Sequence, residues 1–431
     1  MIFAISVGAL TCLLMISAVL FFPKIRIGRV SLSSYWVVTV LGALVLLLTK
    51  TVGIGALGRA LVADSAINPS KILILFISMT LLSIFLDELG FFRYLAGLAL
   101  KRSGKSQRVL FVILYATVSI LTVFTSNDII ILSFTPFVCY FAKNAKIDPL
   151  PYLAAEFVAA NTWSMALIIG NPTNIYLVTA AGGDFLSYLR VMLLPTLAAG
   201  AIACLCLFLL FRKKLSAPIT VEAKEVHIKD RLSLGVGIVH LVICTVILAI
   251  GSYIGIEMWL VSLLALCSLF AWSLDISLVR HVRPSLLAAC LKRAPWELIP
   301  FVLSMFVIVE AFNVTGVTDA VFTLLGSSAS VFKYGISSFL AANFINNIPM
   351  SVFYSAVLSS GSSGAGAVYA TVVGSNLGAC LTPIGALAGI MWSSILKEHG
   401  LKFSYLDFLR IGVTVAVPAL LAALGMLALV L

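Results

Sequence analysis

Four short polar interruptions lie inside long apolar runs and contain the residue types best suited to bind a small solute. They read TSNDII (125–130), AANTWSMALIIGNPTN (159–174), FINNIP (344–349) and GSNLGACLTPIG (374–385). Proline removes a backbone donor and breaks the helical hydrogen-bond pattern, and glycine permits a sharp turn. Asn, Ser and Thr side chains supply both donors and acceptors. The interruptions therefore predict broken helices around a polar site.

The predicted solute-binding side chains are neutral amides and hydroxyls. A broken helix points the amino-terminal end of its second half at the cavity, which favours electron-rich oxygens. No Lys or Arg stands in any of the four interruptions. The predicted substrate-binding residues are Ser126, Asn127, Asn171, Thr173, Asn174, Asn346, Asn347 and Thr382.

Three carboxylates fall within apolar runs, where such groups are functional candidates. Asp128 and Glu156 are the predicted proton-coupling groups, since a low-dielectric cavity disfavours the charged form and promotes proton exchange. Two alternatives stay open: Asp128 caps the helix that follows, and Glu156 points into a vestibule or pairs with a neighbour. Glu310 is expected to reach the outer interface, and Asp87 and Glu88 to contact basic loop residues.

The composition is that of an integral membrane protein. Of 431 residues, 61% are hydrophobic and 10% charged, whereas soluble domains have about 25% charged residues, and the mean hydropathy is +1.15. The net charge of +11 fits basic cytoplasmic loops better than nucleic-acid binding. The eight cysteines have no metal-site spacing, and no catalytic triad or phosphate loop is present. We therefore expect no enzyme activity, no metal and no cofactor.

Apolar length predicts ten membrane spans and two re-entrant hairpins. The amino-terminal run is read as a span, not a signal peptide. The hairpins, 109–141 and 336–359, have limbs of about half to three quarters of a span each. The predicted spans are 1–22, 34–50, 72–90, 152–180, 190–211, 232–253, 258–273, 298–315, 367–396 and 408–431.

The basic residues predict the orientation of the chain. One set of loops contains 23 of the 28 Lys and Arg residues, which makes this set cytoplasmic and places the amino terminus outside. Both ends of the first hairpin are then cytoplasmic, and the second hairpin enters from outside. The cytoplasmic set consists of loops 23–33, 91–108, 142–151, 212–231, 274–297 and 397–410.

The predicted fold is an all-α integral membrane protein with two inverted repeats. Each repeat, 1–211 and 232–431, has five transmembrane helices and one re-entrant hairpin, and 212–231 is the cytoplasmic linker. Asn127 and Asn346 occupy corresponding positions at the hairpin tips. Broken helices that meet near the membrane midplane between inverted repeats are typical of secondary transporters.

The sequence resembles the arsenite permease family of the ion-transporter superfamily over nearly its full length. GNPTN at 170–174 is instead typical of other branches of that superfamily. The stretches that carry the resemblance are FLDELGFFRYLAGLALKR (85–102), SNDIIILSFTP (126–136), LKRAPWELIPFVLSMFVIVEAFNVTGVTD (291–319), NFINNIPMSV (343–352) and SNLGACLTPIGALAGIMW (375–392).

This resemblance implies a secondary active transporter of the inner (plasma) membrane that exports arsenite or antimonite in exchange for protons. Arsenous acid, a neutral polyhydroxy solute, suits an uncharged ring of donors and acceptors. The family also implies an elevator motion, a homodimer in several relatives and an ATPase subunit in some. Sodium/proton antiport and small-anion or dicarboxylate transport remain alternatives, and an ion channel is the alternative outside this class. Thiol capture of arsenic(III) by Cys380 is a further hypothesis.

Overall fold

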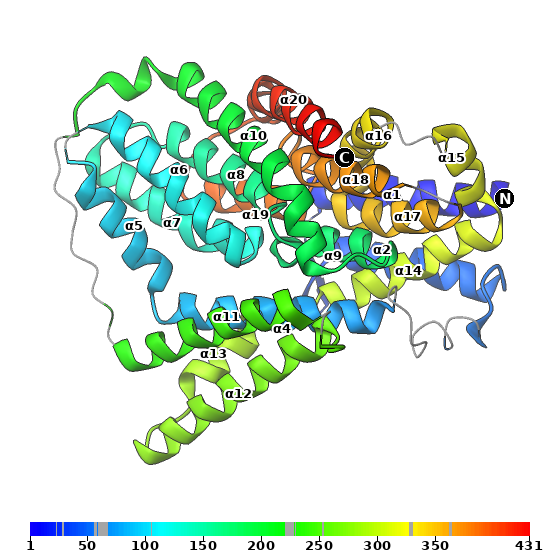
Figure 1. Cartoon of the computed structure of the whole chain (residues 1–431), viewed down its shortest axis with the longest axis horizontal. Coiled ribbons are helices and arrows are strands. Elements are labelled where there is room, and N and C mark those ends of the chain that lie inside the picture. The colour runs from blue at the N-terminus through cyan, green and yellow to red at the C-terminus, as the bar shows by residue number, and fades with distance from the viewer. Residues whose placement is uncertain are drawn as a thin grey trace.

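The computed structural model describes residues 1–22, 24–27, 30–55, 58, 68–104, 106–219, 228, 230–251, 254–326, 331–361 and 364–431. Helices form almost all of it (Figure 1). The first half contains α1 (Ile2–Phe21), α2 (Ser34–Leu48), α4 (Pro69–Glu88), α5 (Phe91–Arg102), α6 (Gln107–Phe124), α7 (Asn127–Ala145), α8 (Leu150–Trp163), η1 (Ile168–Gly170), α9 (Pro172–Ala180) and α10 (Phe185–Phe211).

The second half is also built of long and short helices. A short η2 (Lys214–Ser216) follows α10, and 220–227 and 229 of the predicted linker lie outside the described residues. The second half contains α11 (Arg231–Gly251), α12 (Met258–Val279), α13 (Ser285–Arg293), α14 (Leu298–Val314), α15 (Val317–Leu325), α16 (Val331–Ile345), α17 (Asn347–Ser359), α18 (Ala365–Gly378), α19 (Leu387–Glu398) and α20 (Tyr405–Val430).

Eight helices among the described residues are long and apolar enough to cross a membrane, which fits an integral membrane fold. Seven of them match predicted spans, and the eighth, α6, is a limb of the first predicted hairpin. The other three predicted spans differ: 34–50 is a helix of 15 residues, and 152–180 and 367–396 are each divided by a break. Three predicted loops contain short helices instead: α5, α13 and α15. Residues 24–27 and 30–33, also predicted as loop, form the antiparallel pair β1 (Lys24–Ile27) and β2 (Val30–Ser33), so the chain is not strictly all-α.

The limbs of the first predicted hairpin are longer than expected. The α6 helix has 18 residues and α7 has 19, and at about 1.5 Å per residue each is close to the thickness of a hydrocarbon core. The prediction of half to three quarters of a span was wrong for these two helices, because the helical pattern continues through polar residues up to the interruption. The limbs α16 and α17 are shorter, at 15 and 13 residues.

Local sequence explains where several helices begin. Asn68 accepts hydrogen bonds from the first-turn amides of α4, and Pro69 occupies a position where no amide donor is needed. Asp184 caps α10 in a capping box with Ser187. The hydrogen bond from the Ser187 amide lowers the pKa of the Asp184 carboxyl, so this cap is charged at neutral pH.

Helices from the two halves pack in corresponding pairs. The α2 helix packs on α14 as α12 packs on α4, and α7 packs on α19 as α17 packs on α9. The longest helices of each half, α10 and α20, pack on each other, and Figure 1 shows them side by side at one edge of the molecule. Arg293 binds both Asp87, at 2.7 Å, and Glu88, at 2.5 Å, which confirms that these acids contact a basic loop residue.

The packing of α16 against α18 depends on glycine. A Cβ atom at Gly374 would collide with the Ser338 hydroxyl and the carbonyl oxygen of Gly335. A Cβ atom at Gly378, one turn later, would collide with the carbonyl oxygen of Phe339. Small residues four apart permit such close helix packing in membranes.

We expect Gly374→Ala to destabilise the folded protein by about 1–3 kcal/mol, because overpacking at backbone contact forces the helices apart. Thermal inactivation of the purified protein in detergent measures this loss. Gly425→Ala in α20 is the matched control, since a Cβ there meets nothing within 4 Å. An equal effect of both substitutions would mean that α16 and α18 are not in backbone contact.

Candidate functional site

The four predicted interruptions are breaks between helices in the structure. Residues 125 and 126 separate α6 from α7, and Asn346 separates α16 from α17. Between α8 and α9 lie a turn and η1, and between α18 and α19 the chain makes a series of turns over 379–386. Asn171 caps α9 by accepting from the Thr173 amide at 3.2 Å, with Pro172 next to it.

Asn376 of α18 joins the second half of the chain to the first. Its Oδ1 accepts from the Ser164 hydroxyl and from Asn171 Nδ2, both at 2.9 Å. Its Nδ2 donates to Asn174 Oδ1 at 2.7 Å. Asn174 Nδ2 in turn donates to the carbonyl oxygens of Ser164 and Leu167. All of these side chains are buried, so one network of neutral groups connects two breaks from different halves of the chain.

The first hairpin tip belongs to the same network. Asn127 Nδ2 donates to Asn161 Oδ1 at 3.1 Å, and the Ser164 hydroxyl donates to the Asn161 carbonyl oxygen at 2.9 Å. Thr173 is fully buried beside Asn174. Three of the four breaks are therefore linked by direct side-chain contacts.

The second hairpin tip is bound to the break between α18 and α19. Asn346 Nδ2 donates to the Ile384 carbonyl oxygen at 3.0 Å, and the backbone N–H of Asn347 donates to the Gly385 carbonyl oxygen at 2.9 Å. Thr382 donates to Asn343 Oδ1 at 2.7 Å. Asn346 has φ +70° and ψ 150°, a region that costs a residue other than glycine about 1–3 kcal/mol and is concentrated at functional sites.

Several buried polar atoms of the breaks have no hydrogen-bond partner among the described residues. Buried polar groups in native proteins are usually paired, so these atoms are candidates to pair with a bound solute. The network supplies donors and acceptors without a full charge, so it suits a neutral hydroxylated solute. These atoms are Ser126 Oγ, Asn127 Oδ1, Thr162 Oγ1 and Asn347 Oδ1.

The structure places the candidate carboxylates in three different surroundings. Asp128 is half-buried in the first turn of α7. Ser126 is the N-cap residue of α7, and among the described residues Asp128 makes no side-chain hydrogen bond, so it does not cap that helix. Glu156 is fully buried; its Oε1 accepts from Thr135 at 2.8 Å and its Oε2 has no described partner. Glu310 lines a pocket.

The predicted residue set missed four members of the network. Asn161 and Asn376 lie within the two longer interruptions but are not among the predicted binding residues. Nothing in the sequence marks Ser164 and Asn343 as site residues apart from their position beside a break. Cys380 is buried within its break, and it makes no described side-chain hydrogen bond. No cluster of metal-ligating side chains occurs in the part of the chain that the structure describes.

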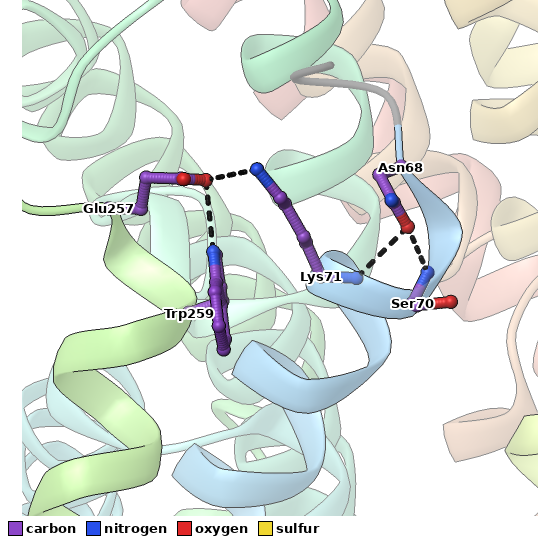
Figure 2. A network of polar contacts seen from close by, with 5 residues as sticks. All are labelled: Asn68, Ser70, Lys71, Glu257 and Trp259. Carbon is purple, nitrogen blue, oxygen red and sulfur yellow. Dashed lines mark hydrogen bonds and ion pairs between the residues drawn. The ribbon is translucent and has the colours of Figure 1, made fainter. Parts of the chain in front are cut away.

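Two cavities lie beside these elements. One of about 260 Å³ lies between α4, α9, α11 and α12 and contains none of the predicted site residues. Figure 2 shows its polar wall: Lys71 reaches Glu257 at 2.7 Å, and the Trp259 indole donates to the same carboxylate at 2.9 Å. The other, of about 300 Å³, is lined by Tyr176, Glu310 and Ser355 among others, next to helices that begin at the breaks.

The Lys71–Glu257 pair joins the start of α4 to the start of α12. We expect Glu257→Gln to change stability by less than about 1 kcal/mol, because more than half of the Glu257 side chain is exposed and water screens such pairs. Thermal inactivation in detergent measures this as well. A larger loss would show that the pair holds the two helices together.

Comparison with known proteins connects the chain to membrane transport. A family model described as a citrate transporter matches residues 12–372. An arsenical pump membrane protein of Yersinia enterocolitica is 28% identical, and the match covers 82% of this chain and 85% of that protein. A putative arsenical pump membrane protein of Bacillus subtilis (strain 168) is 25% identical, with 86% and 88% covered.

A solved structure has the same fold. The YdaH transporter of Alcanivorax borkumensis superposes with a TM-score of 0.58 at 14% identity, over 97% of this chain and 96% of that one.

Proposed function

The chain belongs to the citrate transporter family, and on this premise we propose that it is a secondary active transporter that exports arsenite and antimonite in exchange for protons. The arsenical pump membrane proteins among its relatives support this substrate. The observation that carries the proposal is the buried network of neutral amides and hydroxyls around Asn376.

The chemistry of that network favours a neutral substrate. Arsenous acid has three hydroxyl groups, each both donor and acceptor, and the unpartnered Asn127 and Asn347 oxygens accept from such groups. The substrate-binding residues that we propose are Ser126, Asn127, Asn171, Thr173, Asn174, Asn346, Asn347 and Thr382, together with Asn376.

Carboxylate transport is the second candidate. The description of the matching family favours it, and the helix starts at Asn127 and Asn347 direct their positive ends at the site. No Lys or Arg occurs in the breaks to neutralise a citrate or dicarboxylate. Arsenite export therefore ranks first.

We propose Asp128 as the proton-coupling group and rank Glu156 second. A coupling group must exchange protons with water during transport. Asp128 lies beside Asn127 at the hairpin tip and is half-buried, whereas Glu156 is fully enclosed between α7 and α8. The Thr135 hydrogen bond gives Glu156 a structural role in that contact.

The repeat arrangement follows from the same proposal. We propose that 1–211 and 232–431 are inverted repeats, supported by the corresponding packing pairs of the two halves. The amino terminus and the α14–α15 connection then face the outside, and α2, α4, α12 and α14 form a scaffold along which the break-containing helices move as an elevator. We also propose a homodimer and an ATPase subunit, and the resemblance to the family is the sole support for both.

Expression in a metalloid-sensitive bacterial host tests the substrate. We expect resistance to arsenite and antimonite that does not depend on added sodium, compared with an empty vector. Absence of resistance in a host that contains folded protein would refute arsenite export. Growth rescue by the chain in alkaline, high-sodium medium would favour sodium/proton antiport, and uptake of labelled citrate would favour carboxylate transport.

A further inference from the structure

The pocket of about 300 Å³ between α9, α14, α15 and α17 is acidic and has a hydroxyl-rich inner wall. Two carboxylates line it: Glu310, half-buried, and Asp319, exposed. Tyr176, Glu310 and Asp319 are its titratable residues, and no Lys, Arg or His lines it among the described residues. A pocket with this lining attracts cations and repels anions.

A buried donor without a partner lies in the wall of this pocket. The Tyr176 side chain is 2% exposed, and its hydroxyl has no hydrogen-bond partner within the described ranges. Leaving such a group unpaired costs about 1–3 kcal/mol. The hydroxyl itself is closed to water in this conformation, so a hydrated ion in the pocket pairs with it only after a small movement of the side chain.

One face of α17 leads from this pocket to the network of breaks. Asn347, Ser351, Ser355 and Ser359 recur every four residues and so lie on one side of the helix. The Ser351 hydroxyl lies 3.3 Å from the Ser375 hydroxyl, next to Asn376 in the chain. Ser355 and Ser359 line the pocket. Polar side chains therefore continue from the pocket to the hairpin tip.

We propose that this pocket is the outer mouth of the transport path and binds a monovalent cation there, with the Glu310 and Asp319 carboxylates as its acidic groups. The inference rests on the proposed transport function. The two carboxylates repel citrate or another anion at the same mouth and admit a neutral solute. Hydronium and sodium share the required chemistry, and the experiment separates them.

The charge of the mouth is measured by thiol modification, which needs no transport. Ser359→Cys places a thiol at its exposed rim, and whole cells are treated with methanethiosulfonate reagents that bear either a trimethylammonium or a sulfonate group. The unsubstituted chain gives the background from its own cysteines. The measured quantity is the ratio of the rate with the cationic reagent to the rate with the anionic reagent. We expect this ratio to be on the order of tenfold higher at this thiol than at a small free thiol.

Removal of the carboxylates is the decisive comparison. We expect Glu310→Gln with Asp319→Asn to bring the rate ratio back to that of the free thiol, whereas Asp275→Asn, a carboxylate on α12 outside the pocket, leaves it unchanged. A ratio that does not respond to the double substitution overturns the proposal. So does a thiol that is not labelled from outside in folded protein.

Protection identifies the ion. Sodium at constant ionic strength slows the labelling if sodium is the ligand. Acidic pH slows it more in the parent than in the doubly substituted chain if hydronium is the ligand, because the general loss of thiolate is common to both. Protection by neither ion refutes a cation site. Since labelling does not require arsenite flux, failure of the resistance test alone leaves this result interpretable.

Discussion

Asn376→Leu is expected to abolish transport and to destabilise the protein by about 2–4 kcal/mol. The substitution leaves Asn171 Nδ2 and Asn174 Oδ1 without their buried partners, and unpaired buried groups cost about 1–3 kcal/mol each. Hydrogen bonds measured within membranes fall at the lower end of that range. Transport in proteoliposomes and thermal inactivation in detergent measure the two effects.

The matched control is Asn144→Leu, which makes the same change at an exposed position near the end of α7. We expect it to leave both transport and stability within experimental error of the parent. If Asn376→Leu retained full transport at a stability equal to that of the parent, Asn376 would not be the centre of the site.

Asp128→Asn is expected to uncouple transport from the proton gradient. The substituted amide has the same shape but does not bind and release a proton, so stimulation of arsenite flux by an imposed pH gradient falls by more than tenfold. Flux down the arsenite gradient continues in the same vesicles. Counterflow of labelled substrate in proteoliposomes measures this uncoupled exchange.

Glu156→Gln provides the control for a charge change on the neighbouring helix. The glutamine oxygen keeps the hydrogen bond from Thr135 and removes a carboxyl that has no described counter-charge, so stability stays equal or rises. We expect normal proton coupling. If proton coupling survived in Asp128→Asn but were lost in Glu156→Gln, Glu156 and not Asp128 would be the proton-coupling group.

Sequence alone predicted the long apolar helices and the approximate position of each break, since lipid sets the length of an apolar span and Pro, Gly and Asn mark where backbone groups need other partners. It did not predict α5, α13 and α15, because these helices are short and amphipathic and lie between spans. Their apolar faces are stabilised by packing against neighbours, as between α5 and α6.

The partners within the site could not be read from the sequence. Asn161 and Asn376 have the same residue type and each lies in a long interruption, yet Asn161 binds the nearby hairpin tip while Asn376 binds the other half of the chain. Amide side chains offer several equivalent pairings, and only tertiary packing selects among them. The acidic pocket near Glu310 was missed for the same reason, since its walls come from four separate helices.

The bond from Asn376 to Asn174 has a consequence for biosynthesis. These residues are 202 positions apart, and at about 5–20 residues per second a ribosome needs roughly 10–40 s to add that length of chain. During this interval Asn174 Oδ1 and Asn171 Nδ2 lie in a nascent first half without their final partner. The first half is then a substrate for membrane chaperones and proteases, and slow codons or truncation before residue 376 lengthen its exposure to them.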